Sequence, residues 1–156
     1  MILKYENDKD NGLFQLSDFS CSDQNRQLNA DKLYRIVWVK GTPAEFVVDG
    51  VPIKISTNQV AFFTPHNHVE VITKHHELIS FSFSKEFYCI NDHDQEVSCY
   101  GYLFYGSSSV PVVNLKENDV ESFELLMKVL QEEFEEVDHI QGEMLRVLLK
   151  RLLIKF

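Results

Sequence analysis

The sequence is short of positive charge. Its 15 Lys and Arg residues stand against 24 Asp and Glu residues, so the formal net charge is −9 at pH 7. Direct binding of nucleic acid normally needs a basic face, because Lys and Arg side chains neutralise the phosphates. This chain is therefore a poor phosphate binder, and any contact with DNA would have to be made by another segment.

Cysteine is also scarce, and long apolar runs are missing. The three cysteines, Cys21, Cys89 and Cys99, are odd in number and show no C-x-x-C spacing, which argues against a disulfide framework and a zinc ribbon. No apolar run approaches the roughly 18 residues of a membrane span, and the first residues lack a basic region followed by an apolar one. We therefore expect a protein of the reducing cytoplasm.

Glycine and proline are sparse, whereas phenylalanine is frequent. Six Gly and four Pro in 156 residues exclude a low-complexity or collagen-like chain. The length suits one compact domain with its own core. Twelve Phe residues can fill that core or line a pocket within it.

The first half of the chain changes texture near Tyr34. Residues 1–32 are mostly polar, and we interpret them as an N-terminal arm with room for one strand. Short β-type runs separated by turns follow. Asp49-Gly50 lies between two β-branched runs and suits a type I′ hairpin turn, because both positions need positive φ. Pro52 donates no backbone hydrogen bond, so its strand is expected at an edge.

Seven β-type runs at close spacing indicate a barrel or a sandwich. They cover residues 33–41, 45–55, 59–64, 68–73, 77–84, 100–106 and 110–115. Within 78–84 the alternation is strict, with Leu78 and the serines on one face and Ile79, Phe81 and Phe83 on the other. We expect the aromatic face to lie inside.

Two helices follow, because the apolar period switches to 3.6 residues. Asn118 with Glu121, and later Asp138 with Gln141, match the capping arrangement of a helix start. The apolar stripes comprise Phe123, Leu126, Leu130 and Phe134 in the first helix, and Met144, Leu145, Leu148, Leu149, Leu152, Leu153 and Phe156 in the second.

The second helix is apolar over a wider surface than one buried stripe needs. We expect a two-fold dimer contact along it, made by Leu145, Leu148, Leu149 and Leu152. The alternative is a helix that is covered by its own barrel. The first helix ends in an acidic cluster and the second is basic, so the charges complement each other within or between subunits. The alternative is a solvated acidic face.

The order of segments resembles a known family. The strand "YRIVWVKG", the hairpin "VDGVPIKIS", the run "NQVAFFTPHNHVEV" and the final helical "GEMLRVLLKRLLIK" are similar to the N-terminal sensing and dimerisation domain of AraC-family bacterial transcription regulators. The similarity covers roughly residues 30–156. The helical pattern continues to the last residue without a stop signal, which we interpret as a chain cut from something longer.

The resemblance implies a fold and a function. It implies a mainly β fold with C-terminal helices, in which a cupin-like (jelly-roll) β-barrel at 33–116 precedes a helical dimerisation segment at 117–156. It implies a homodimer, a small-molecule effector, and a role in transcription activation. DNA would be bound by a C-terminal domain with two helix-turn-helix motifs that is absent from this chain.

The histidines do not match the pattern of the metal-binding cupins. No histidine precedes His66, which occupies a turn, and His68 is the best candidate for an inward position. Arg35 falls near the place of an inward carboxylate or amide, and its guanidinium would repel a divalent cation. It could pair with an anionic or polyol ligand, or form a surface salt bridge. The remaining histidines are His75, His76, His93 and His139.

We therefore expect neither metal nor cofactor and no enzymatic activity. The candidates for lining a ligand pocket are Arg35, Val37, Trp38, Phe46, Phe62, His68, Phe81 and Phe83. Since Val37 and Trp38 are adjacent on one strand, both cannot face inward. Two alternatives stay open, namely a metal-dependent cupin enzyme (an oxygenase or isomerase) and a barrel that serves only for dimerisation.

Overall fold

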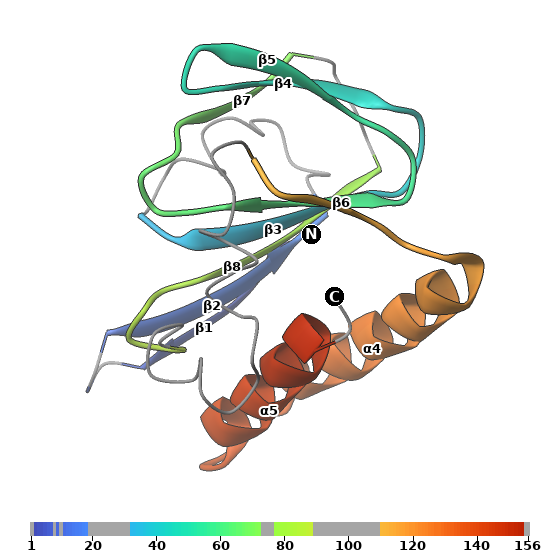
Figure 1. Cartoon of the computed structure of the whole chain (residues 1–156). Coiled ribbons are helices and arrows are strands. Elements are labelled where there is room, and N and C mark those ends of the chain that lie inside the picture. The colour runs from blue at the N-terminus through green and yellow to red at the C-terminus, as the bar shows by residue number, and fades with distance from the viewer. Residues whose placement is uncertain are drawn as a thin grey trace.

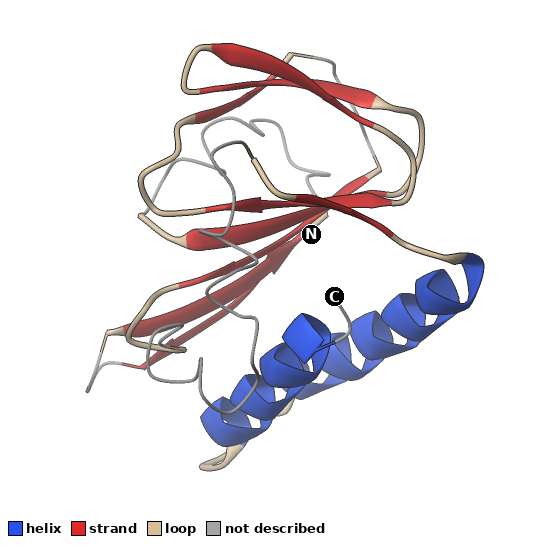
Figure 2. Cartoon of the chain, in the orientation of Figure 1, coloured by secondary structure: helices blue, strands red, loops and turns tan. Residues whose placement is uncertain are grey.

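The computed structural model describes residues 2–7, 9, 11–18, 32–72, 77–88 and 110–154. These residues form strands first and helices last (Figures 1 and 2). The elements are β1 (Ile2–Asn7), β2 (Gly12–Ser17), β3 (Tyr34–Val39), β4 (Ala44–Val48), β5 (Val51–Ile55), β6 (Gln59–Phe63), β7 (Val69–Val71), β8 (Leu78–Phe83), β9 (Val112–Asn114), α4 (Glu117–Glu135) and α5 (Gln141–Ile154).

The strands form two antiparallel sheets. The large sheet has six strands in the order β1-β2-β8-β3-β6-β9, and the small sheet has three in the order β5-β4-β7. The small sheet covers one face of the large sheet and the two helices cover the other (Figure 1). The prediction of a mainly β fold with two C-terminal helices is confirmed. Over the described strands, however, the two sheets do not close into a barrel.

The N-terminal residues contribute to the large sheet. Residues 2–17 form the hairpin of β1 and β2, and β2 pairs with β8 in the sheet interior. Phe14 and Leu16 on β2 are fully buried. The interpretation of this part as a polar arm is therefore corrected, because burial of two large apolar side chains outweighs the polar residues around them.

The β4–β5 hairpin turns as the sequence predicts. Asp49 has φ 52° and Gly50 has φ 83°, so both turn residues adopt the left-handed conformation that a type I′ turn requires. Pro52 lies in β5, which is an edge strand of the small sheet. Both predictions are confirmed.

Two separate cores form because the large sheet is buried on both faces. Every residue of β3 is buried, and alternate side chains enter opposite cores. One core lies between the large sheet and the helices and includes Trp38, Phe81 and Phe123. The other lies between the two sheets and includes Val37 and Phe46.

The aromatic face of β8 points to the helices and not into the space between the sheets. Ile79, Phe81 and Phe83 belong to the core beneath the helices, whereas Leu78 belongs to the core between the sheets. The expectation that this aromatic face lines a barrel interior is therefore wrong. Alternation separates two faces of a strand, but when both faces are buried it does not say which of them meets the second sheet.

The helix starts differ in detail from the capping prediction. Helix α4 begins at Glu117, and the backbone N–H of Lys116 donates to Asp119 at 3.4 Å. Before α5, Asp138 accepts from the backbone N–H of Ile140 at 3.0 Å. The side chain of Gln141 caps no N–H of its own helix; it donates to the carbonyl of Phe134 at 3.0 Å and so ties α5 to the end of α4.

The leucines predicted to form a dimer contact are buried within the chain. Leu145, Leu148, Leu149 and Leu152 all pack in the core between the helices and the large sheet. The assignment of these leucines to a dimer contact is corrected, because they pack against the large sheet of the same chain. This is the alternative that the sequence left open. Neither of the two described helices has the length and apolar character needed to cross a membrane.

Candidate functional site

Buried polar side chains gather on the face of the large sheet that is turned toward the small sheet. We call Ser17, Arg35, Ser80 and Ser82 the inner polar cluster. Register places Arg35 opposite Ser82 and Ser17 opposite Ser80, and all four residues are buried. The hydroxyl oxygens of Ser80 and Ser82 lie 3.2 Å apart. The cluster thus interrupts an apolar core with hydrogen-bonding groups on three neighbouring strands.

Arg35 is the charged member of the cluster, with a relative exposure of 2%. Its Nη2 donates to the carbonyl oxygens of Thr64 and Asn67, both at 2.7 Å. Its guanidinium carbon lies 5.8 Å from the centroid of the Phe63 ring. Burial lowers the pKa of Arg35 to about 10, so the side chain stays protonated at neutral pH. Because the Arg35 side chain is buried, the alternative of a surface salt bridge is wrong.

A hydrogen-bonded network leads from Arg35 to the surface. Asn67, whose carbonyl accepts from Arg35, donates its Nδ2 to Asp49 at 2.7 Å. Asp49 also accepts from the backbone N–H of His68 at 2.8 Å. These two hydrogen bonds, the backbone bond first, hold the pKa of Asp49 below its ordinary value. The network joins the hairpin tip of the small sheet to a buried cation in the large sheet.

His68 does not line the interior. Its side chain is 63% exposed and its Nε2 lies 3.2 Å from Glu70. The prediction of an inward His68 is wrong because Val69 and Val71 take the inward positions of β7, and strand alternation then turns His68 and Glu70 outward. His66 is exposed, as its place in the turn predicts.

The other predicted pocket residues are divided between the two cores. Val37 and Phe46 lie between the sheets, on the side of the inner polar cluster. On the opposite face, beneath the helices, lie Trp38, Phe62, Phe81 and Phe83. The structure therefore brings Arg35, Val37 and Phe46 to one side of the large sheet, and it separates them from the four aromatic residues.

Metal-ligating side chains do not converge in the part of the chain that the structure describes. Within residues 2–72, 77–88 and 110–154, apart from the undescribed positions among them, no three His, Cys, Asp or Glu side chains form a possible metal site. His139 is exposed before α5. The predictions for His75, His76, His93 and the three cysteines fall outside the described residues.

A second surface of interest is the outward face of the helices. Of the 11 large hydrophobic side chains that are exposed in the described residues, seven belong to the helical segment. They are Leu125, Val129, Val137, Ile140, Met144, Val147 and Ile154. An exposed apolar patch can mark an interaction site, and five of these residues lie on α4 or α5 while Val137 and Ile140 lie between the two helices. We call these residues the outer helical face.

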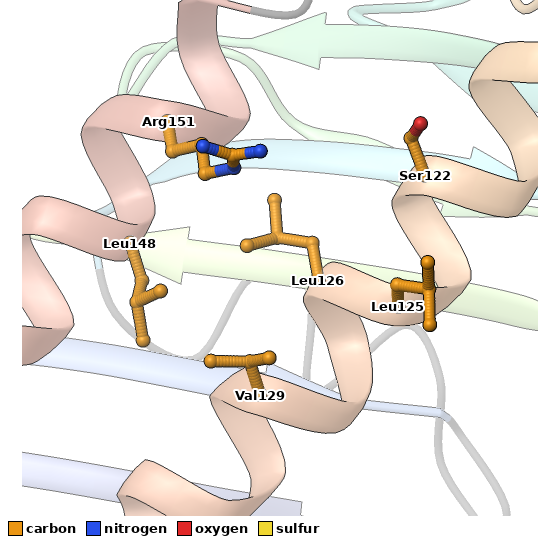
Figure 3. A pocket seen from close by; sticks show the side chains of 6 residues that line it. All are labelled: Ser122, Leu125, Leu126, Val129, Leu148 and Arg151. Atoms are coloured by element: carbon orange, nitrogen blue, oxygen red, sulfur yellow. The ribbon is translucent and has the colours of Figure 1, made fainter.

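A groove of about 260 Å³ runs between α4 and α5 on this face. Leu125, Leu126, Val129 and Leu148 give it apolar walls, and Arg151 and Ser122 lie at one end (Figure 3). The sequence indicated that the second helix is apolar over more than one stripe, but the predicted contact was assigned to the leucines that the structure buries; the spacing of the exposed residues holds the missing signal. Met144, Val147, Arg151 and Ile154 recur at three and four residues and form a second stripe beside the buried leucines.

No protein-family model matches this sequence, and a search of curated proteins finds no significant match. Function is therefore inferred from the inner polar cluster, the outer helical face and the sheet that separates them.

Proposed function

We propose that this chain is the effector-sensing and dimerisation part of an AraC-type transcription regulator, built on a cupin-like arrangement of its strands. The observation that carries the proposal is the buried, protonated Arg35 on the inner face of the large sheet. Burying a charge is costly, and the carbonyl oxygens of Thr64 and Asn67 compensate part of this cost through Nη2 of Arg35. A cation and serine hydroxyls in the interior suit a sensing site better than a structural core, which apolar side chains fill without this penalty.

The inner polar cluster favours a small polar effector that carries an anionic group or several hydroxyls. A guanidinium presents hydrogen-bond donors in a planar fork that matches a carboxylate. Serine hydroxyls both donate and accept, so Ser80 and Ser82 suit ligand hydroxyls. Val37 and Phe46 would give such a ligand an apolar wall.

The outer helical face favours dimerisation by a second copy of the chain. Its exposed apolar residues need a cover, and α4 and α5 differ in charge. Glu132, Glu135 and Glu136 are exposed near the end of α4, while Arg151 is exposed on α5. A two-fold partner that crosses α4 over α5 brings these opposite charges together. The contact residues proposed here are Leu125, Val129 and Val147, in place of the buried leucines.

The large sheet connects the two surfaces. Strand β3 presents Arg35 and Val37 to one face and Ile36 and Trp38 to the other, where the Trp38 ring lies 5.9 Å from that of Phe123 on α4. An effector that prefers one position of β3 would therefore favour one position of the helices. A ligand can shift a conformational equilibrium only if it binds one of the two states more tightly than the other.

Transcriptional control requires DNA contact, which an acidic chain is ill suited to make itself. In this proposal a separate helix-turn-helix domain binds DNA in the cytoplasm, and the chain described here pairs two such domains. The dimer would act as an activator when the effector changes how the pair is presented.

The sensing part is tested by thermal unfolding in the presence of D-gluconate, citrate and D-glucose, which are a polyhydroxy monocarboxylate, a tricarboxylate with a single hydroxyl and a neutral polyol. We expect the anions to raise the melting temperature of the wild type and of a Lys54→Arg control on the exposed strand β5. The increase in melting temperature should be smaller in Ser82→Ala, which removes one hydroxyl. It should vanish in Arg35→Lys, because an ammonium lacks the planar pair of donors that a guanidinium presents. Equal increases in all four proteins would contradict a site at Arg35.

One observation favours a second candidate, a domain that serves only for dimerisation. Phe46 and Phe63 pack with ring centroids 6.4 Å apart in the core between the sheets, so that side chains of the protein already fill part of this space. An absence of any effector response, together with a stable dimer, would favour this function over sensing.

A further inference from the structure

The edges of the two sheets differ in how they are protected. An edge strand presents unpaired backbone N–H and C=O groups that invite pairing with another chain. Of the four edge strands, β7 and β9 have three residues each, and β5 contains Pro52, which lacks an N–H. Strand β1 has six residues and no proline. It is the long, regular edge of the described sheets.

Strand β1 pairs with β2 alone among the described strands. Its side chains alternate, with Ile2, Lys4 and Glu6 exposed and the odd-numbered residues partly buried toward the helices. Lys4 and Glu6 form an exposed ion pair of 2.8 Å on one face. An opposite-charge pair two residues apart is self-complementary in an antiparallel arrangement.

We propose that β1 of a second copy pairs antiparallel with β1, with the two-fold axis at Tyr5. This register sets Lys4 opposite Glu6 of the second copy and Glu6 opposite its Lys4. The six-stranded sheets of the two copies then become one continuous sheet through main-chain hydrogen bonds. Opposite charges at directly opposed positions favour such pairing, and like charges oppose it.

The charges of Lys4 and Glu6 favour the register with its axis at Tyr5 over the registers shifted by one residue or by half a residue. An axis at Lys4 would set the two Lys4 side chains opposite each other, and an axis at Glu6 would do the same for the two Glu6 side chains. An axis between residues would oppose Lys4 to Tyr5 or to Asn7, with no opposite charge. Among the residues of β1, only the axis at Tyr5 gives two attractive pairs, since register shifts by one residue also turn side chains to the other face.

The β1 contact is independent of the proposed function. It lies at the edge of the large sheet, whereas the outer helical face lies on α4 and α5 (Figure 1). A wild-type chain would use the helical contact first and join such dimers through β1 as its concentration rises. A chain with Leu125→Glu and Val147→Glu, which charge the helical face, isolates the β1 contact.

The experiment exchanges charges in that background. Lys4→Glu and Glu6→Lys each set like charges opposite each other, and we expect each to weaken self-association about tenfold in sedimentation equilibrium. Mixing the two variants sets a chain with two glutamates at these positions opposite a chain with two lysines, so association should return. It should also return in the double Lys4→Glu, Glu6→Lys variant, in which the two charges have changed places.

Mixing the two single variants distinguishes the effect of the contact between chains from the effect of the Lys4–Glu6 ion pair within one chain. Both single variants lose the pair within the chain, and mixing does not restore it. Recovery on mixing therefore reports contact between chains. At concentrations well above micromolar, a background chain that stays monomeric, single variants that associate as the background does, or a mixture as weak as its components would overturn the proposal. Circular dichroism of each variant verifies that β structure is retained.

Discussion

At the scale of single residues, Asp49 is the exposed carboxylate with the clearest structural role. It accepts hydrogen bonds from Asn67 and from the backbone of His68, and both lower its pKa. A carboxylate whose pKa is lowered by folding stabilises the folded state above its unfolded pKa of about 3.9, and this contribution is lost as pH falls through the folded value. Asp49 adopts the left-handed turn conformation. Asparagine tolerates this conformation as well, so Asp49→Asn removes the charge without straining the turn.

We therefore expect Asp49→Asn to lower the free energy of unfolding at pH 7, by no more than about 1 kcal/mol because the site is exposed. The deficit should narrow as pH falls below about 4, where the wild-type carboxylate becomes protonated. Urea unfolding at several pH values measures it. Glu86→Gln, at an exposed glutamate, serves as the control. A deficit that stays constant down to the acid limit would show that charge is not the cause.

At the scale of secondary structure, the end of α4 carries charge of the wrong sign. Negative side chains near a helix C-terminus oppose the helix dipole, and the last turn of α4 has no basic residue. Partial burial, followed by the nearby Glu136 and Asp138, raises the pKa of Glu133. A raised carboxyl pKa means that the ionised form destabilises the folded state at neutral pH.

Glu133→Gln should consequently stabilise the protein at pH 7, by about 0.5 kcal/mol. The gain should disappear as pH falls through the raised pKa, because the wild-type side chain is then neutral as well. Chemical unfolding at both pH values provides the measurement. Glu121→Gln, in the first half of the same helix, is the matched control and should bring no gain. A similar gain from both substitutions would argue for a general effect of net charge.

The elements also show what sequence reasoning achieves and where it stops. The strands, the Asp49-Gly50 turn and both helices follow from local patterns, since turn conformation and apolar period are encoded in adjacent residues. The side on which each stripe packs is not local. Phe81 and Leu149 each present a clear apolar face, but only the arrangement of the other layers decides that both faces meet in the core between the helices and the large sheet.

At the scale of the whole molecule, the large sheet separates two cores whose residues the sequence alone had merged into one predicted pocket. The pocket candidates predicted from sequence combined residues of both faces, because adjacent positions such as Val37 and Trp38 differ only in parity. His68 was misplaced for the same reason. Arg35 could be singled out as a candidate, yet its burial depends on the distant turn at residues 64–67 that accepts its hydrogen bonds.

The three-layer arrangement accounts for the proposed coupling. In the proposal, the effector meets the polar groups on one face of β3 and β8, and the partner chain meets the helices that cover the other face. The helices can associate through their outer side because their inner side is already satisfied by Leu145, Leu149 and Leu152. Dimerisation should thus be separable from folding.

The most direct test is the molar mass of the chain by light scattering at micromolar concentration, for the wild type and two variants. We predict a dimer for the wild type and, at this concentration, a folded monomer for Leu125→Glu with Val147→Glu, because the β1 contact joins chains only at higher concentration. Circular dichroism verifies that this variant keeps its helices and strands. We predict a destabilisation of about 2–5 kcal/mol for Leu149→Ala, which opens a cavity in the core. At micromolar concentration, a monomeric wild type, or a dimer that persists when the outer helical face is charged, would contradict the account.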